Sequence, residues 1–276
     1  SMSNLVNSSG VVASDVTGVG TARLGVRGTT YGGDKGIFAF GNPAASGDTA
    51  VSNLVSNVGV IATDTSGVGT TRDKLAVTTY GTGTAIFAYG QNYPDSVSMS
   101  NLVSDQGVIA SDVSGVGTVR QDLAAVAYST DKGIFAYGVE PHTGSGGLYS
   151  LSNKVGNNGV IASDVTGVGT ARSELAAASY GVGKGAFAYG QLGSVTSLKN
   201  LVSDAGVIAS DTTGVGTARR GVGACGYGID KGIFAYGFED LSISNLMSNT
   251  GVIAANVTGV GSGRSDLGAL GLSLSG

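Results

Sequence analysis

Short apolar segments alternate with glycine-rich turns along the chain. Between residues 151 and 189, for example, four such segments follow one another, at Leu151–Val155, Val160–Asp164, Leu175–Tyr180 and Gly185–Tyr189. Each has five or six residues and is rich in Val, Ala, Phe or Tyr, which is typical of strands rather than helices. The last two flank the turn residues Gly181–Lys184 and therefore predict a β-hairpin.

The same set of segments recurs in six tandem copies. Each copy begins with a Ser-Asn-Leu-Val-like segment whose Asn is followed nineteen residues later by Arg. In five copies, the Gly that closes a Phe-Ala-Tyr/Phe-Gly segment follows eighteen residues after that Arg. Only the stretch from this Gly to the next Asn varies, at 12, 11, 15, 10 and 8 residues. The anchors are Asn4, Asn53, Asn101, Asn153, Asn200 and Asn245; the arginines are Arg23, Arg72, Arg120, Arg172, Arg219 and Arg264.

A repeat of about 45–52 residues with four strands is the size of one β-propeller blade. We therefore expect an all-β fold in which residues 1–276 form a single six-bladed β-propeller with four-stranded antiparallel blades. A parallel β-helix and a trimeric fibrous β-structure are the alternatives. The sixth copy ends before its Phe-Ala-Tyr-Gly segment, so one blade is expected to have three strands, or Gly271–Ser275 supplies a degenerate replacement.

Composition excludes several other classes of protein. The chain contains 49 Gly but only 3 Pro, and it is 41% apolar and 12% charged, which fits neither collagen nor a disordered chain. A single cysteine, Cys225, excludes an internal disulfide, and a single histidine excludes His-rich zinc sites. No apolar run is long enough for a membrane span, no secretory leader is evident, and the net charge of −4 argues against nucleic-acid binding.

Three segments carry a resemblance to known proteins. Units such as Asp131–Gly138, Ser100–Val103 and Val160–Gly169 resemble tandem-repeat proteins of environmental, especially marine, bacteriophages. That resemblance implies a virion or tail-associated protein and carries no catalytic residue. The hairpin of residues 175–190 resembles kelch-like and RCC1-like propeller repeats more distantly, without their Trp and Gly-Gly.

The variable connections are where we expect a ligand site, because loop insertions in repeat proteins commonly lie on one binding face. They contain all three prolines and five acidic residues but no Lys or Arg, so their charge is −5, whereas the remaining 14 acidic and 15 basic residues give +1. The candidate ligand-binding residues are Tyr93, Asp95, Glu140, His142, Tyr149, Phe238, Glu239 and Asp240.

Aromatic rings beside carboxylates suit carbohydrate recognition, and we expect a non-enzymatic, virion-associated protein that binds a host-surface glycan through this acidic loop face. No Asp-x-Asp-x-Asp spacing predicts a calcium site, and no metal or cofactor is expected. Two other functions stay open. The protein could be a structural spacer or assembly module that contacts other virion proteins, or a glycan hydrolase using Glu140 and Asp95. The loop residues could also simply provide solubility.

Two further residue types recur in every copy. An Asp precedes each Thr/Ser-Gly-Val-Gly turn and is replaced by Asn256 in the last copy, which favours a structural Asx-turn over a ring of cation ligands. The six arginines are expected to bond to backbone carbonyls or carboxylates between blades, rather than form an exposed ring that grips an anionic polymer.

Overall fold

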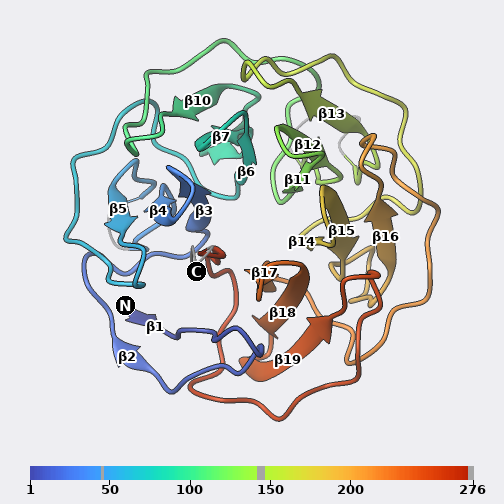
Figure 1. Cartoon of the computed structure of the whole chain (residues 1–276). Helices are drawn as coiled ribbons and strands as arrows, with labels where there is room; N and C mark the ends of the chain where they lie inside the picture. The colour runs from blue at the N-terminus through green and yellow to red at the C-terminus, as the bar shows by residue number, and fades with distance from the viewer. Residues whose placement is uncertain (45–46, 142–146, 273–276) are drawn as a thin grey trace.

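The computed structural model describes residues 1–44, 47–141 and 147–272, and within these ranges it is all-β, with no helix. Figure 1 shows the sheets arranged around a common centre. Every strand pairing is antiparallel, so the parallel β-helix alternative is wrong. The strands are β1 (Met2–Ser3), β2 (Val16–Thr17), β3 (Arg27–Tyr31), β4 (Lys35–Ala39), β5 (Ser52–Val55), β6 (Ala76–Tyr80), β7 (Thr84–Ala88), β8 (Gln91–Asn92), β9 (Asp95–Ser96), β10 (Ser100–Val103), β11 (Ala124–Tyr128), β12 (Lys132–Ala136), β13 (Ser152–Val155), β14 (Ala176–Tyr180), β15 (Lys184–Ala188), β16 (Lys199–Val202), β17 (Gly223–Tyr227), β18 (Lys231–Gly237) and β19 (Leu241–Met247).

Each three-stranded sheet combines strands from two successive copies of the repeat. The predicted hairpin is confirmed as β14 and β15, and the third strand of that sheet is β16, which belongs to the next copy. The same order gives the sheets β3-β4-β5, β6-β7-β10, β11-β12-β13 and β17-β18-β19. The short strands β1 and β2 form a two-stranded sheet, and β8 and β9 form a small hairpin within one variable connection. The structural unit is therefore offset from the sequence repeat by about half a copy.

The second strand predicted in each copy does not form. In the fourth copy, the segment that includes Val160–Asp164 meets β13 only through isolated bridges, Val155 to Ile161 and Ser152 to Val165. The Asn153 side chain explains the interruption, because its amide donates to the Ala162 carbonyl (3.0 Å) and to Asp164 Oδ1 (2.8 Å). These side-chain bonds interrupt the backbone ladder. The sheets consequently have three strands instead of the expected four.

The repeated arginine is buried in four of the six copies, at Arg72, Arg120, Arg172 and Arg219. The guanidinium of Arg172 lies 4.3 Å from the centre of the Tyr137 ring and is completely buried. It donates to the carbonyls of Thr170 (3.3 Å) and Tyr189 (3.0 Å) and to Asn200 Oδ1 (2.7 Å), the anchor Asn of the next copy. The expected bonding between neighbouring units is confirmed. An exposed arginine ring is wrong, since Arg72, Arg120 and Arg219 are also buried.

The repeated aspartate completes this contact between copies. Asp211 Oδ2 accepts hydrogen bonds from the backbone N–H (2.9 Å) and hydroxyl (2.6 Å) of Thr170, and Oδ1 accepts one from the Asn200 amide (2.8 Å). The role is structural, as predicted, but the partner belongs to the preceding copy, so the local Asx-turn is wrong. Each such set combines a repeated Arg and the nearby Thr or Ser of one copy with the Asn and Asp of the next copy. We call this set an inter-repeat clasp. In the last copy Asn256 stands in place of the Asp. Its Oδ1 accepts a hydrogen bond from the Thr217 N–H, and its Nδ2 donates one to the Thr217 hydroxyl.

The two ends of the chain are joined by a sixth clasp. Arg264 donates to Asn4 Oδ1 and lies 4.0 Å from the centre of the Tyr236 ring. The backbone N–H and hydroxyl of Ser262 donate to Asp15 Oδ2, at 2.9 and 2.7 Å. Hydrogen bonds from Asn4 and Ser262 lower the pKa of Asp15. The last copy therefore contacts the first through the same groups that join successive copies.

Glycine is required just after the hairpin of β11 and β12, where the chain contacts the next copy of the repeat. Gly138 closes a Phe-Ala-Tyr-Gly segment with φ of 103°, and its N–H donates to the Arg172 carbonyl of the next copy (2.9 Å). A Cβ atom at this position would lie 2.8 Å from the Gln121 carbonyl oxygen. Both the left-handed backbone and the close approach therefore exclude larger residues here.

We expect the substitution Arg172→Met to lower the free energy of unfolding by about 3 kcal/mol, since it leaves buried polar groups on Asn200 and two carbonyls without their donor. Denaturant unfolding followed by fluorescence or circular dichroism measures the change. Arg23→Met is the matched control, because Arg23 is half-buried and no aromatic ring of the described residues lies beneath its guanidinium. Equal losses in the two variants would contradict this account of the clasp.

Candidate functional site

A ring of strained residues surrounds the centre of the molecule. The second residue after each repeated arginine has a left-handed backbone, with φ between 52° and 63°; these residues are Gly25, Lys74, Asp122, Glu174, Gly221 and Asp266. Backbone hydrogen bonds join them in series: Asp122 N–H to the Lys74 carbonyl (2.9 Å), and likewise Glu174 to Asp122, Gly221 to Glu174, Asp266 to Gly221 and Gly25 to Asp266. Left-handed backbone at non-glycine residues is unfavourable and concentrates at functional sites.

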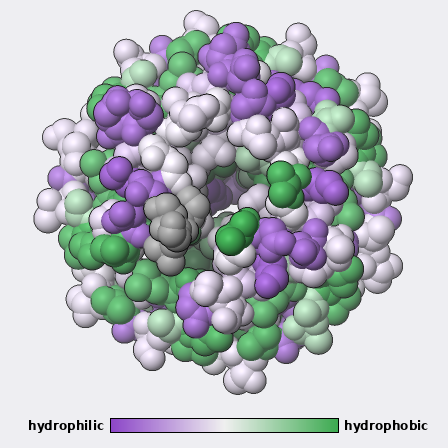
Figure 2. All heavy atoms as spheres, viewed as in Figure 1, coloured by the Kyte–Doolittle hydropathy of each residue, from purple (hydrophilic) through white to green (hydrophobic). Residues whose placement is uncertain are grey.

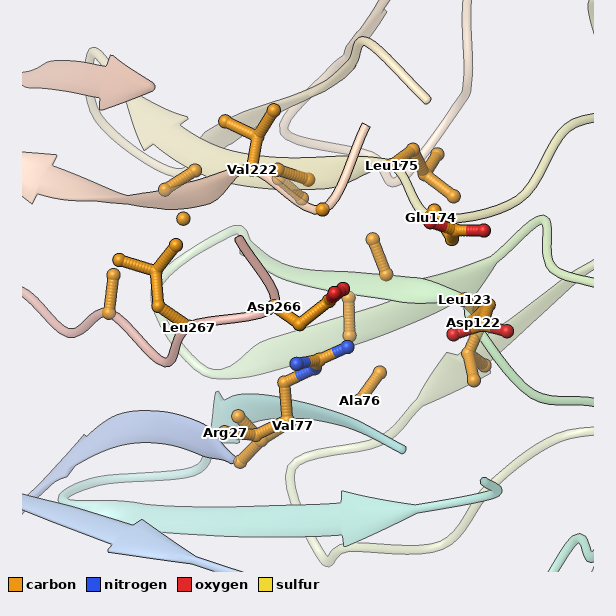
Figure 3. A pocket seen from close by; sticks show the side chains of 18 of the residues that line it. Arg27, Ala76, Val77, Asp122, Leu123, Glu174, Leu175, Val222, Asp266 and Leu267 are labelled. Atoms are coloured by element: carbon orange, nitrogen blue, oxygen red, sulfur yellow. The ribbon is translucent and has the colours of Figure 1, made fainter. Parts of the chain in front are cut away.

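A narrow cavity of about 80 Å³ lies on the axis beside this ring. Its walls come from the beginnings of β3, β6, β11, β14 and β17 and from residues close to them in the sequence or in the last copy. They carry the charged side chains of Arg27, Asp122, Glu174 and Asp266. Figure 3 shows the side chains of Arg27 and Asp266 extending toward the middle of the cavity, with Asp122 and Glu174 on another side. Figure 2 shows the corresponding hollow at the centre of the molecular surface. Within the described ranges, no group of three or more His, Cys, Asp or Glu side chains is arranged to hold a metal ion.

Charges of both signs meet at the cavity. Glu174 Oε1 lies 2.7 Å from Arg220 Nη1 and also accepts a hydrogen bond from Gln191 Nε2 (2.6 Å). Burial, with the neighbouring Asp122 carboxylate, raises the pKa of Glu174. Burial also raises the pKa of Asp122, against the opposing effect of Lys74 and Arg27. The site therefore offers hydrogen-bond donors and acceptors around a small volume without a single dominant charge.

Asp73 lies at the edge of this ring and is another carboxyl group whose pKa burial raises. Burial, together with the Asp48 carboxylate on a variable loop, raises the pKa of Asp73 to about 6. Its Oδ1 atom is buried and has no hydrogen-bond partner among the described residues. Asp73 thus carries a destabilising charge at neutral pH.

The variable connections begin at the same end of the sheets as the ring. Isolated bridges join the residue after each of four repeated arginines to the first residue of a variable connection: Leu24 to Asn42, Asp73 to Gln91, Gln121 to Val139 and Ser173 to Gln191. Phe238, at the start of the last connection, lies over Arg220 with 4.1 Å between the guanidinium carbon and the ring centre. The constant ring and the variable loops therefore share one face.

The structure places the predicted loop residues in different environments. Tyr93 is 79% exposed and its N–H lies 3.4 Å from Asp48 Oδ2; Asp95, Phe238, Glu239 and Asp240 are also exposed. Tyr149 is half-buried and Glu140 is buried, whereas His142 lies outside the described residues. None of the seven described residues lines the axial cavity. Phe238 is linked to it through Arg220 and Glu174.

The hydrolase hypothesis gains no support from this arrangement. Glu140 is 2% exposed, while Asp95 is at the surface in the preceding connection, and neither lines the axial cavity. A catalytic carboxylate pair must flank one substrate bond from within the same site. The two residues do not share a described cavity.

Sequence reasoning missed the residues that face the axis. Their signal was available in the constant spacing: the second residue after the repeated arginine is charged in four copies, as Lys74, Asp122, Glu174 and Asp266. Variation in charge at one constant position indicates that this position faces solvent or a cavity rather than the core.

No protein-family model matches the chain, and no curated protein matches its sequence. Across the described ranges, the structure contains no helix with the length and apolar character needed to cross a lipid bilayer.

We expect Asp73→Asn to stabilise the protein at pH 8 by about 3 kcal/mol, the cost of a carboxyl pKa raised from 3.8 to about 6. Because the folded-state pKa is raised, the wild-type protein loses stability as the pH rises from about 4 to about 6, and the full cost applies above pH 6. The gain should therefore disappear near pH 4. Urea unfolding of both proteins at pH 4 and pH 8 measures it, and a gain independent of pH would contradict the assignment.

Proposed function

We propose that the chain forms a six-bladed β-propeller in a bacteriophage particle and binds a host-surface glycan, without catalysis, through the face that carries the variable loops. The propeller is supported by five three-stranded sheets and one two-stranded sheet around a common centre, and by six clasps, one of which joins the chain ends. The phage association rests on the sequence resemblance alone.

One observation carries the binding proposal: the five connections that vary in length begin on the face that also carries the mixed charges of the axial cavity. Tyr93 and Phe238 expose aromatic rings on these connections, close to carboxylates and, for Phe238, beside Arg220. Aromatic faces for sugar rings, with carboxylates and guanidiniums for hydroxyl groups, are the chemistry of a polar, uncharged ligand. The constant sheets hold these variable groups at fixed positions.

We expect the full chain to bind a bacterial-surface glycan on a broad glycan array, and Tyr93→Ala and Phe238→Ala each to weaken binding about tenfold, because exposed aromatic anchors commonly supply much of the binding energy. Val182→Ala is the matched control, since Val182 is equally exposed but lies in the hairpin turn between β14 and β15. Absence of binding across the array, or equal binding by Tyr93→Ala and the wild type, would count against the proposal.

A second candidate function, an assembly module of the virion, is favoured by a different surface. The seventh residue after each anchor Asn is an exposed valine, between 59% and 64% accessible; these are Val11, Val60, Val108, Val160, Val207 and Val252. Exposed apolar side chains at the same position of every copy would give neighbouring subunits a regular set of apolar contacts.

If the protein is an assembly module, electron microscopy of intact particles should show density that accounts for it, with neighbouring subunits against these valines. Particles without such density would remove this candidate. Glycan binding in solution is independent of that result, so the two functions are tested separately.

A further inference from the structure

A groove lies on the β14-β15-β16 sheet (Figure 1). Its volume is about 390 Å³, which is enough for a small molecule, and it is lined by Tyr180, Lys184, Leu201, Ser203, Val207 and Ala209. Lys184 is the first residue of β15, whereas the variable connection follows the other end of that strand, after Ala188. The groove is therefore at the opposite end of the sheet from the face that we propose to bind a glycan.

The strand register places four of the lining residues in one row. Tyr180 pairs with Lys184 across the hairpin of β14 and β15. The pairing of β15 with β16, continued by one residue, puts Lys184 opposite Ser203. Ser203 N–H in turn donates to the Val207 carbonyl (3.0 Å). Because residues opposite one another on neighbouring strands share a face of the sheet, these four side chains project together.

Two hydroxyl groups in this row are free to donate hydrogen bonds. Tyr180 is only 5% exposed, yet its hydroxyl donates to no acceptor among the described residues, whereas the hydroxyl of Tyr189 donates to a backbone carbonyl (3.2 Å). Ser203 Oγ accepts the N–H groups of Ala205 (3.3 Å) and Val207 (3.2 Å), which leaves its own proton for another acceptor. A buried hydroxyl without a partner is unfavourable, so a ligand that accepts from it is stabilised.

Lys184 adds a free positive charge between these hydroxyls. In the β11-β12-β13 sheet, the equivalent Lys132 has an aspartate before it in the sequence, and its Nζ lies 2.6 Å from that carboxylate. The residue before Lys184 is Gly183. The exposed Asp204 follows Ser203 in the adjoining turn, but Lys184 forms no ion pair with it or with any other residue that the structure describes. Its ammonium group is thus available to an anion.

The equivalent row differs in other sheets. Thr84 stands at the lysine position in the β6-β7-β10 sheet. In the β11-β12-β13 sheet, Lys154 replaces the leucine, and its Nζ lies 5.7 Å from the centre of the Tyr128 ring. In the β17-β18-β19 sheet, the Ser248 hydroxyl shares a hydrogen bond with the Thr250 hydroxyl (2.8 Å). These differences distinguish the β14-β15-β16 groove from its counterparts in those three sheets.

Apolar side chains lie beside the donors. Val207 is 60% exposed and Leu201 is half-buried, and both line the groove. Ala209 lies next to Leu201, since its N–H donates to the Leu201 carbonyl (2.8 Å). Covering these side chains removes apolar surface from water, which favours a ligand with an apolar part. The groove therefore combines a cationic row with an apolar wall.

We propose that this groove binds a small organic carboxylate with a short apolar chain. The carboxylate accepts hydrogen bonds from the Lys184 ammonium and from the hydroxyls of Tyr180 and Ser203, while the chain lies against Leu201 and Val207. An ionised carboxylate has only acceptors, which matches a row of three donors, and its bonds to an ammonium group are stronger than those between neutral groups. An amine would be repelled by Lys184, and an inorganic anion would leave the apolar wall uncovered.

The test is calorimetry of the full chain with octanoate as the probe. We expect saturable binding that is about tenfold weaker in Lys184→Gln and about fivefold weaker in Tyr180→Phe, which keeps the ring and removes only the hydroxyl. Lys35→Gln is the matched control, because Lys35 has the same position in the β3-β4-β5 sheet but is paired with Asp34 (3.3 Å). Octanol and acetate each lack one half of the recognised chemistry, and both should bind at least about tenfold more weakly.

Methyl NMR of the valine-labelled protein locates the site. Octanoate should shift the methyl signals of Val207 and leave those of Val160, the equivalent valine beside Lys154, in place. No binding at millimolar octanoate, equal losses in Lys184→Gln and Lys35→Gln, or shifts of similar size at both valines would each overturn the proposal. Tyr93→Ala should bind octanoate like the wild type, so this test and the glycan test fail independently.

Discussion

The buried guanidinium of the inter-repeat clasp governs the relation between neighbouring sheets. A charge without water must have its donors satisfied, and an unpaired buried charge costs several kcal/mol. In Arg172 the ring face of Tyr137, two carbonyl oxygens and the Asn200 side chain meet that requirement, and these groups belong to three successive copies, the third, fourth and fifth. Satisfying the charge therefore fixes how one sheet lies against the next. Since the same groups recur, the same displacement is repeated around the centre.

The constant spacings in the sequence predicted which residues are equivalent, but not which strands share a sheet. The hairpin of β14 and β15 follows from local turn residues, whereas the addition of β16 depends on a contact with the next copy, for which the sequence has no local signal. The segment at Val160–Asp164 has strand-like composition, yet its Ala162 carbonyl accepts a hydrogen bond from the Asn153 side-chain amide instead of from a neighbouring strand. The repeated Arg and Asp were correctly interpreted as structural residues. The Arg occurs in all six copies, and the Asp is replaced only once, by the isosteric Asn256.

The candidate site was predictable in part for a different physical reason. Loop length is visible in a sequence, so the variable connections were found, and exposed Tyr93 and Phe238 lie on them. The axial cavity forms where residues from several copies converge, and that convergence depends on contacts between copies that are distant in the sequence. The link between the two regions runs through Phe238, Arg220 and Glu174, one stacking contact followed by one ion pair.

The offset between sequence copy and sheet has a consequence for how such a chain can diversify. Each variable connection starts at a closing Gly and ends just before an anchor Asn, so both junctions are the same in every copy. Recombination between near-identical copies would exchange whole connections while every clasp stays intact, because the clasp residues lie outside the exchanged segment. The loops on this surface can thus be exchanged between copies without compensating substitutions in the sheets or the clasps.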